Sequence, residues 1–108
     1  MSVPEIDVHE LARLRDGGGA TLLDVRNADE WEDARVPGVP LIPLGELAER
    51  TDDVPDGEPL YVICAVGGRS ARAAEHLRRL GIDAVNVAGG TKAWIDSGRP
   101  VVTGPDPI

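Results

Sequence analysis

Three short apolar segments recur along the chain, at residues 20–25, 60–63 and 84–87. None of them alternates regularly between apolar and polar positions. A near-continuous apolar run of this length is typical of a strand that is covered on both faces, as in a parallel sheet. We therefore predict three buried strands, and a shorter strand at Ile6.

Between these strands the apolar positions follow a helical period. A first helix is predicted after Asp7, whose side chain is a good N-cap, and it ends at the glycines of residues 17–19. The clearest helix is predicted over residues 70–80, because four apolar side chains share one face and Gly81 is a natural C′ residue: Ala73, Ala74, Leu77 and Leu80. Shorter helical segments are predicted at residues 27–31, 45–50 and 91–96.

Strands that alternate with helices predict an α/β fold with a mainly parallel central sheet and helices on both of its faces. The chain has 108 residues, which fits one domain over residues 1–108. Residues 104–108 are rich in proline and glycine, and we expect them to form a loose tail.

The charge of the chain excludes several classes of partner. The formal net charge is -8, whereas binding to nucleic acid or to an anionic membrane needs a basic face. No segment is long and apolar enough to span a membrane, and the N-terminus does not resemble a signal peptide, so we expect a cytoplasmic protein. The two histidines, His9 and His76, lack ligand spacing, and we expect neither a metal nor another cofactor.

The single cysteine is the strongest candidate for chemistry. Cys64 follows a predicted buried strand and precedes Gly67, Gly68 and a helix. The glycines allow the backbone to curl so that successive N–H groups converge, and with the helix N-terminus they favour an anion such as a thiolate. Arg69 adds a positive charge. A cysteine in such a position is otherwise a small buried hydrophobic residue, and the local residues alone leave both interpretations open.

Residues 64–70, Cys-Ala-Val-Gly-Gly-Arg-Ser, resemble the active loop of the rhodanese-like sulfurtransferase family. Residues 87–94 resemble the later Gly-Gly…Trp signature of that family. Residues 22–26 with Glu30 and Trp31 resemble its first strand and turn, and residues 36–39 and 42–44 resemble the stretch that follows. The resemblance covers nearly the whole chain in order.

The resemblance implies a two-step sulfur transfer by a single-domain enzyme of the thiosulfate sulfurtransferase type. Cys64 is implied to take a sulfane sulfur from a donor such as thiosulfate, hold it as a persulfide, and release it to cyanide or to a thiol, which includes a protein thiol. The rest of the loop is implied to bind the transferred sulfur: Ala65, Val66, Gly67, Gly68, Arg69 and Ser70. The side chain of Arg69 is expected to brace the loop, and Asp24 and Arg26 to support the site without contacting substrate, or else to form an ordinary surface ion pair.

The chain departs from the family pattern at three points. Many members that use thiosulfate have a basic residue directly after the cysteine, where this chain has Ala65 and then Val66. The opening of the site therefore carries less positive charge than is usual in these members, so thiosulfate is not expected to be the favoured donor. Arg35 stands where the family commonly has histidine, a position we expect to be structural. With no second cysteine, release of the sulfur requires an outside acceptor.

Two other functions remain as alternatives. A related cysteine phosphatase or arsenate reductase uses a longer C-x5-R loop, but here Cys64 and Arg69 are in C-x4-R spacing, with Ser70 at the phosphatase arginine position. The stronger alternative is a non-catalytic rhodanese-like module that relays sulfur to a partner or serves as a docking surface.

Overall fold

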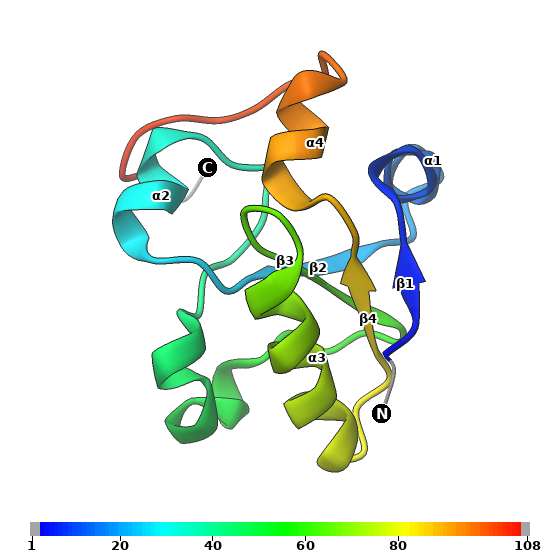
Figure 1. Cartoon of the computed structure of the whole chain (residues 1–108), viewed down its shortest axis with the longest axis vertical. Coiled ribbons are helices and arrows are strands. Elements are labelled where there is room, and N and C mark those ends of the chain that lie inside the picture. Colours follow the sequence, from blue (N-terminus) through cyan, green and yellow to red (C-terminus); the bar gives the residue numbers. More distant parts are fainter. Residues whose placement is uncertain (1–2, 107–108) are drawn as a thin grey trace.

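Four parallel strands form the centre of the computed structural model, which describes residues 3–106. The strands lie in the order β1-β4-β3-β2 across the sheet (Figure 1). Their bounds are Glu5–Ile6 for β1, Thr21–Asp24 for β2, Leu60–Ile63 for β3 and Ala84–Val87 for β4. The predicted parallel sheet is confirmed, with each predicted strand in place.

Within residues 3–106, three α-helices and two 3₁₀ turns connect the strands, and a fourth α-helix follows β4. The helices are α1 (Val8–Asp16), α2 (Ala28–Asp33), α3 (Gly68–Arg79) and α4 (Gly90–Asp96). The turns η1 (Leu44–Glu49) and η2 (Thr51–Asp53) follow one another before β3. The predicted cap of α1 forms, because Asp7 Oδ1 accepts a hydrogen bond of 2.9 Å from the N–H of Glu10.

Helices cover both faces of the sheet, as predicted, and each face has its own apolar core. Successive side chains of a strand point to opposite faces. Tyr61 and Ile63 of β3 pack in one core with residues of α1 and α4, whereas Leu60 and Val62 pack in the other with residues of α3 and η1. Cys64 continues the second set, so its side chain lies on the α3 face.

Helix α3 begins two residues before its predicted start. Gly67 is its N-cap with φ of +112°, a left-handed conformation that glycine adopts without the steric cost of a Cβ. The turn after Cys64 is therefore tighter than expected. As a result Ser70, where the helix was predicted to begin, lies inside its first turn and is fully buried.

The parallel arrangement brings three strand ends to one edge of the sheet. Asp24 ends β2, Cys64 follows β3, and the glycines at residues 89 and 90 follow β4. Ligand sites of open α/β sheets lie at this carboxyl edge. The fold thus gathers the cysteine loop, the predicted Asp24–Arg26 pair and the start of α4 in one place.

The C-terminal segment is attached as far as the structure describes it. Gly104 N–H donates to Glu32 O at 2.7 Å, and the Arg35 guanidinium donates to the carbonyls of Gly104, at 2.7 Å, and Asp106. Arg35 is 1% exposed, and its guanidinium lies 3.6 Å from the centre of the Trp31 ring. Residues 104–106 of the expected loose tail are therefore held by backbone and Arg35 contacts, and residues 107–108 lie outside the described residues.

Replacing Arg35 tests this attachment. Arg35→Leu keeps much of the apolar volume but removes the donors to the tail carbonyls, so we expect the free energy of unfolding to fall by about 2–3 kcal/mol. Urea unfolding measures the change. Arg13→Leu is the matched control, because Arg13 is exposed and pairs with Glu10 on the surface of α1. Equal stability of the Arg35→Leu and Arg13→Leu variants would contradict the assigned role.

Candidate active site

The Cys64 sulfur lies inside the loop that joins β3 to α3. The residue is 1% exposed. Its Sγ accepts hydrogen bonds from Gly67 N–H at 3.1 Å and from the Ser70 hydroxyl at 3.2 Å. The loop is thus folded around the sulfur, with donors directed at it.

Two opposing effects set the pKa of the Cys64 thiol. Burial disfavours the charged thiolate and raises the pKa. Hydrogen bonds from the Ser70 hydroxyl and from the N–H groups of Ser70, Gly67 and Val66 favour the thiolate and together bring the pKa below its ordinary value. The loop therefore holds a buried thiol that ionises more readily than a free cysteine. The thiolate is the form of cysteine that acts as a nucleophile.

Helix α4 fixes the orientation of the loop from behind. Cys64 O accepts from Thr91 N–H at 2.9 Å and from Thr91 Oγ1 at 3.0 Å, and Ala65 O accepts from Lys92 N–H at 3.0 Å. These bonds require close approach at Gly90, where an added Cβ would lie 2.5 Å from Cys64 O. The carbonyls of Cys64 and Ala65 therefore point to α4.

Arg69 joins the loop to α2. Its Nη1 and Nη2 donate to the two carboxylate oxygens of Glu30 at 2.7 and 2.8 Å. Bonding to Arg69 lowers the pKa of Glu30 to about 2, so the pair stays charged at neutral pH. Arg69 thus makes the bidentate contact that a brace requires. The sequence predicted the Arg69 brace but not its partner, which lies 39 residues earlier.

The predicted pair of Asp24 and Arg26 is buried, and it is not a surface ion pair. Arg26 Nη2 lies 2.8 Å from Asp24 Oδ2, and Arg26 Nε lies 3.0 Å from the same oxygen. Arg26 Nη2 also donates to Ala34 O at 2.8 Å. These contacts tie the end of β2 to the segment after α2, and neither side chain bonds to the sulfur.

A polar side chain that the sequence analysis did not select completes the site. Asn86 of β4 is buried, and its Oδ1 lies 2.5 Å from Ser70 Oγ. Its Nδ2 donates to Gly67 O at 3.2 Å and to Glu5 Oε2 at 2.7 Å. The sequence feature that could have identified Asn86 is its amide side chain within the otherwise apolar segment of residues 84–87.

The remaining loop residues form an apolar rim. Val66 is 63% exposed, and Ala65 lines a shallow cavity of about 280 Å³ beside the loop. The cavity is bounded by residues of α4 and the end of β2, among them Ile95, which is 45% exposed, and Arg26. No basic side chain projects from the two positions after the cysteine.

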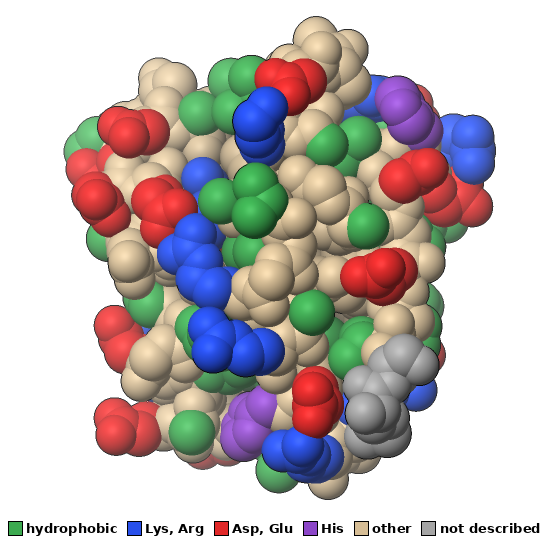
Figure 2. Space-filling view, in the orientation of Figure 1, with side chains coloured by type: hydrophobic (Ala, Val, Ile, Leu, Met, Phe, Trp, Pro, Cys, Tyr) green, Lys and Arg blue, Asp and Glu red, His purple; other side chains and the backbone are tan. Residues whose placement is uncertain are grey.

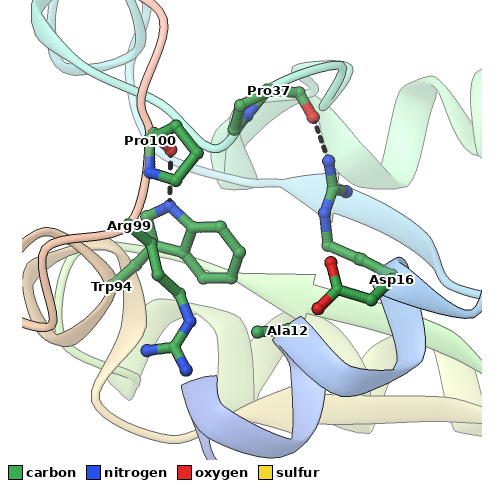
Figure 3. A pocket seen from close by; sticks show the side chains of 7 residues that line it. Ala12, Asp16, Pro37, Trp94, Arg99 and Pro100 are labelled. Atoms are coloured by element: carbon green, nitrogen blue, oxygen red, sulfur yellow. Dashed lines mark hydrogen bonds between the residues drawn. The ribbon is translucent and has the colours of Figure 1, made fainter.

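A second cavity, of about 390 Å³, lies between α1 and α4 (Figure 3). Two of its polar side chains are engaged: Trp94 Nε1 donates to Pro100 O at 2.8 Å, and the Arg15 guanidinium donates to Pro37 O. Cys64 does not line this cavity. Within residues 3–106 we find no cluster of three potential metal-ligating side chains and no helix that could cross a membrane.

Comparisons with known proteins agree with this geometry. The model of the rhodanese-like domain matches residues 7–97. The chain is 37% identical over 95 residues to a putative sulfur carrier protein, YrkF of Bacillus subtilis, covering 86% of this chain but only 51% of that protein. It is 31% identical over 102 residues to a sulfurtransferase of Allochromatium vinosum, covering 93% of this chain and 95% of the other.

A solved structure gives the same result for the fold. The crystal structure of a rhodanese-related protein from Thermoplasma volcanium superposes with a TM-score of 0.84 at 36% identity, covering 92% of this chain and 97% of that one. The chain belongs to the rhodanese-like domain family.

Proposed function

We propose that this protein is a sulfurtransferase that carries a sulfane sulfur on Cys64 as a persulfide. The observation that carries the proposal is the ring of donors around Cys64 Sγ, which includes Gly67 N–H at 3.1 Å. Such a ring stabilises a thiolate before the transfer and an anionic outer sulfur after it. The names of the related sulfurtransferase and putative sulfur carrier are consistent with this chemistry.

The transfer proceeds in two steps. The Cys64 thiolate first attacks the outer sulfur of a donor such as thiosulfate, and a new S–S bond forms. The S–S bond of the donor breaks, and sulfite leaves with the electron pair of that bond. A thiophilic acceptor, cyanide or a thiolate, then attacks the outer sulfur of the persulfide. The S–S bond to Cys64 breaks, and the cysteine thiolate is restored.

The rim favours an organic or protein-bound sulfur over a small inorganic anion. Val66 and Ile95 are both exposed, and Ile95 lines the same cavity as Ala65 of the loop. Figure 2 shows basic side chains beside exposed hydrophobic side chains on one face of the molecule. Two of the basic side chains already have partners, since Arg69 pairs with Glu30 and Lys92 with Asp96. Because the rim is apolar and these cations are paired with carboxylates, the site attracts a dianion such as thiosulfate only weakly.

The same rim supports a second candidate function, a sulfur relay. The exposed Val66 beside the sulfur would contact a partner protein that presents its own thiol or persulfide. In that role Cys64 forms the same persulfide but delivers it to one protein acceptor, with little turnover of cyanide.

The first prediction concerns the persulfide itself. Incubation with thiosulfate or an organic sulfane donor should add the mass of one sulfur atom to the intact chain, and cyanide should remove it as thiocyanate. Cys64→Ser should abolish both signals, because Cys64 is the only cysteine. Intact-mass spectrometry and a thiocyanate assay measure them. Thiocyanate formation that persists in Cys64→Ser at the wild-type rate rules out the mechanism.

The second prediction concerns the brace. Arg69→Lys keeps the charge but loses the planar fork that binds both oxygens of Glu30, so we expect a less ordered loop and turnover reduced about tenfold. Arg79→Lys on the same helix is the matched control, because the partner of Arg79, Glu75, lies away from the loop. Wild-type turnover in Arg69→Lys would show that the brace is not needed.

The third prediction separates the sulfur donors. Ala65→Arg places a cation at the mouth, and one added charge near a bound dianion should lower the KM for thiosulfate about fivefold. Leu80→Arg adds the same charge at an exposed position at the far end of α3 and should not lower it. An equal fall of the KM for thiosulfate in both variants, or no fall in Ala65→Arg, would contradict the proposed effect of charge at the mouth of the site.

A further inference from the structure

The hydroxyl of Ser70 faces two groups that can both accept its proton. Ser70 Oγ lies 3.2 Å from Cys64 Sγ and 2.5 Å from Asn86 Oδ1. All three residues are at most 1% exposed, so water does not readily replace a missing partner. A hydroxyl carries one proton and therefore donates to only one of these two acceptors at a time.

The orientation of the Asn86 amide is fixed by its other neighbours. Its Nδ2 lies 3.2 Å from Gly67 O and 2.7 Å from Glu5 Oε2, and a carbonyl and a carboxylate only accept. The amide nitrogen must therefore face Gly67 and Glu5, and the oxygen must face Ser70. Asn86 is consequently a permanent competitor for the Ser70 proton.

The protonation state of the sulfur decides the competition. A neutral Cys64 thiol donates its own S–H to Ser70 Oγ, and the Ser70 proton goes to Asn86 Oδ1, so every group is satisfied. A Cys64 thiolate can only accept, and the Ser70 proton must leave Asn86 to reach it. In a persulfide the charge lies on the outer sulfur, and the Ser70 proton is again free to return to Asn86.

We propose that Asn86 is a positioning residue that acts on Cys64 through Ser70, by drawing the Ser70 proton away from the sulfur in the thiol and persulfide states. The inference rests on the proposed function of Cys64 as a nucleophile. By limiting the stabilisation of the thiolate, Asn86 keeps the sulfur from becoming a weak nucleophile, because nucleophilicity falls as the pKa of a thiol falls. When the acceptor takes the outer sulfur, the Ser70 proton turns to the departing Cys64 thiolate.

Charged groups on the surrounding elements also influence the sulfur and must be separated from this effect. They are Glu5 of β1, Asp24 and Arg26 at the end of β2, Glu30 of α2, Arg69 of α3 and Lys92 of α4. Of these, Glu5 is the one whose hydrogen bond to Asn86 would be lost when Asn86 is replaced. Glu5→Gln is therefore the control, because it removes the charge and retains an acceptor for Asn86 Nδ2.

The experiment measures the ionisation of Cys64 without any sulfur donor. Because the chain has one cysteine, thiolate absorbance and the rate of alkylation by iodoacetamide report on Cys64 alone. In Asn86→Leu the titration midpoint should fall by about one pH unit, and the alkylation rate of the fully ionised thiolate should fall about threefold. Glu5→Gln should stay close to the wild type in both measurements.

A double-variant comparison tests whether Asn86 acts through Ser70. Ser70→Ala removes the donor to the sulfur and should raise the midpoint by about one unit. The double variant Ser70→Ala/Asn86→Leu should then titrate like Ser70→Ala, since Asn86 no longer has a hydroxyl to compete for. The proposal is overturned if Asn86→Leu lowers the titration midpoint of Cys64 equally in the wild-type and Ser70→Ala backgrounds. It is also overturned if Asn86→Leu lowers the midpoint in neither background.

A measurement on the unaltered chain keeps the proposal testable if Asn86→Leu does not fold. The ¹³Cγ resonance of Asn86 should shift with the same midpoint as the ¹³Cβ resonance of Cys64, because the amide loses its hydrogen bond as the thiolate forms. An Asn86 signal that does not titrate with Cys64 refutes the link. These readouts are independent of sulfur uptake, so a chain that titrates as predicted but never binds sulfur would refute only the proposed function.

Discussion

The orientation of the peptide groups between Cys64 and Ser70 is the constraint on which the site depends. Each peptide group has an N–H on one side and a C=O on the other. An N–H group beside a buried thiolate stabilises its negative charge, whereas a carbonyl oxygen there repels it. The first turn of α4 binds the carbonyls of Cys64 and Ala65. Val66 N–H shares a peptide group with Ala65 O and so points the opposite way, and it donates to the sulfur together with Gly67 N–H. The left-handed conformation of Gly67 and the bare Cα of Gly90 make this arrangement sterically possible.

This constraint explains why distant segments converge on the loop. Burial alone would raise the pKa of Cys64, and the donors of the loop reverse that effect only if they are held rigidly. Arg69 is fixed by Glu30 of α2, and Gly67 O accepts from Asn86 Nδ2 of β4, while Asn86 Oδ1 competes with the sulfur for the Ser70 hydroxyl proton. Elements from the whole length of the chain thus position a single sulfur atom.

Sequence patterns were enough to predict the parts of the structure that depend on local order. The buried strands, the helices on both faces and the loop after Cys64 follow from runs of apolar residues and from glycine positions. The start of α3 at Gly68 was missed, because it depends on the left-handed conformation of Gly67, which places the N-cap three residues before the predicted first residue, Ser70. The attachment of residues 104–106 was also missed, since nothing near them in the sequence indicates that Arg35 binds their carbonyls.

The contacts that tune the site could not be predicted for a related reason. Glu30 and Asn86 meet the loop only after the strands have assembled in their order across the sheet. Asn86 interrupts an apolar segment, but a polar residue in a strand does not reveal its partner. The resemblance to a known family identified the loop and its cysteine, whereas the hydrogen bonds among Asn86, Ser70 and Cys64 are visible only in the three-dimensional structure.

The most direct test of the central claim, that the loop holds a sulfur on Cys64, is a crystal structure determined after exposure to a sulfane sulfur donor. We expect a second sulfur about 2.05 Å from Cys64 Sγ, enclosed by the N–H groups of Val66, Gly67 and Ser70. An unmodified Cys64 under conditions in which the donor is consumed, or an added sulfur that points out of the loop, would contradict it.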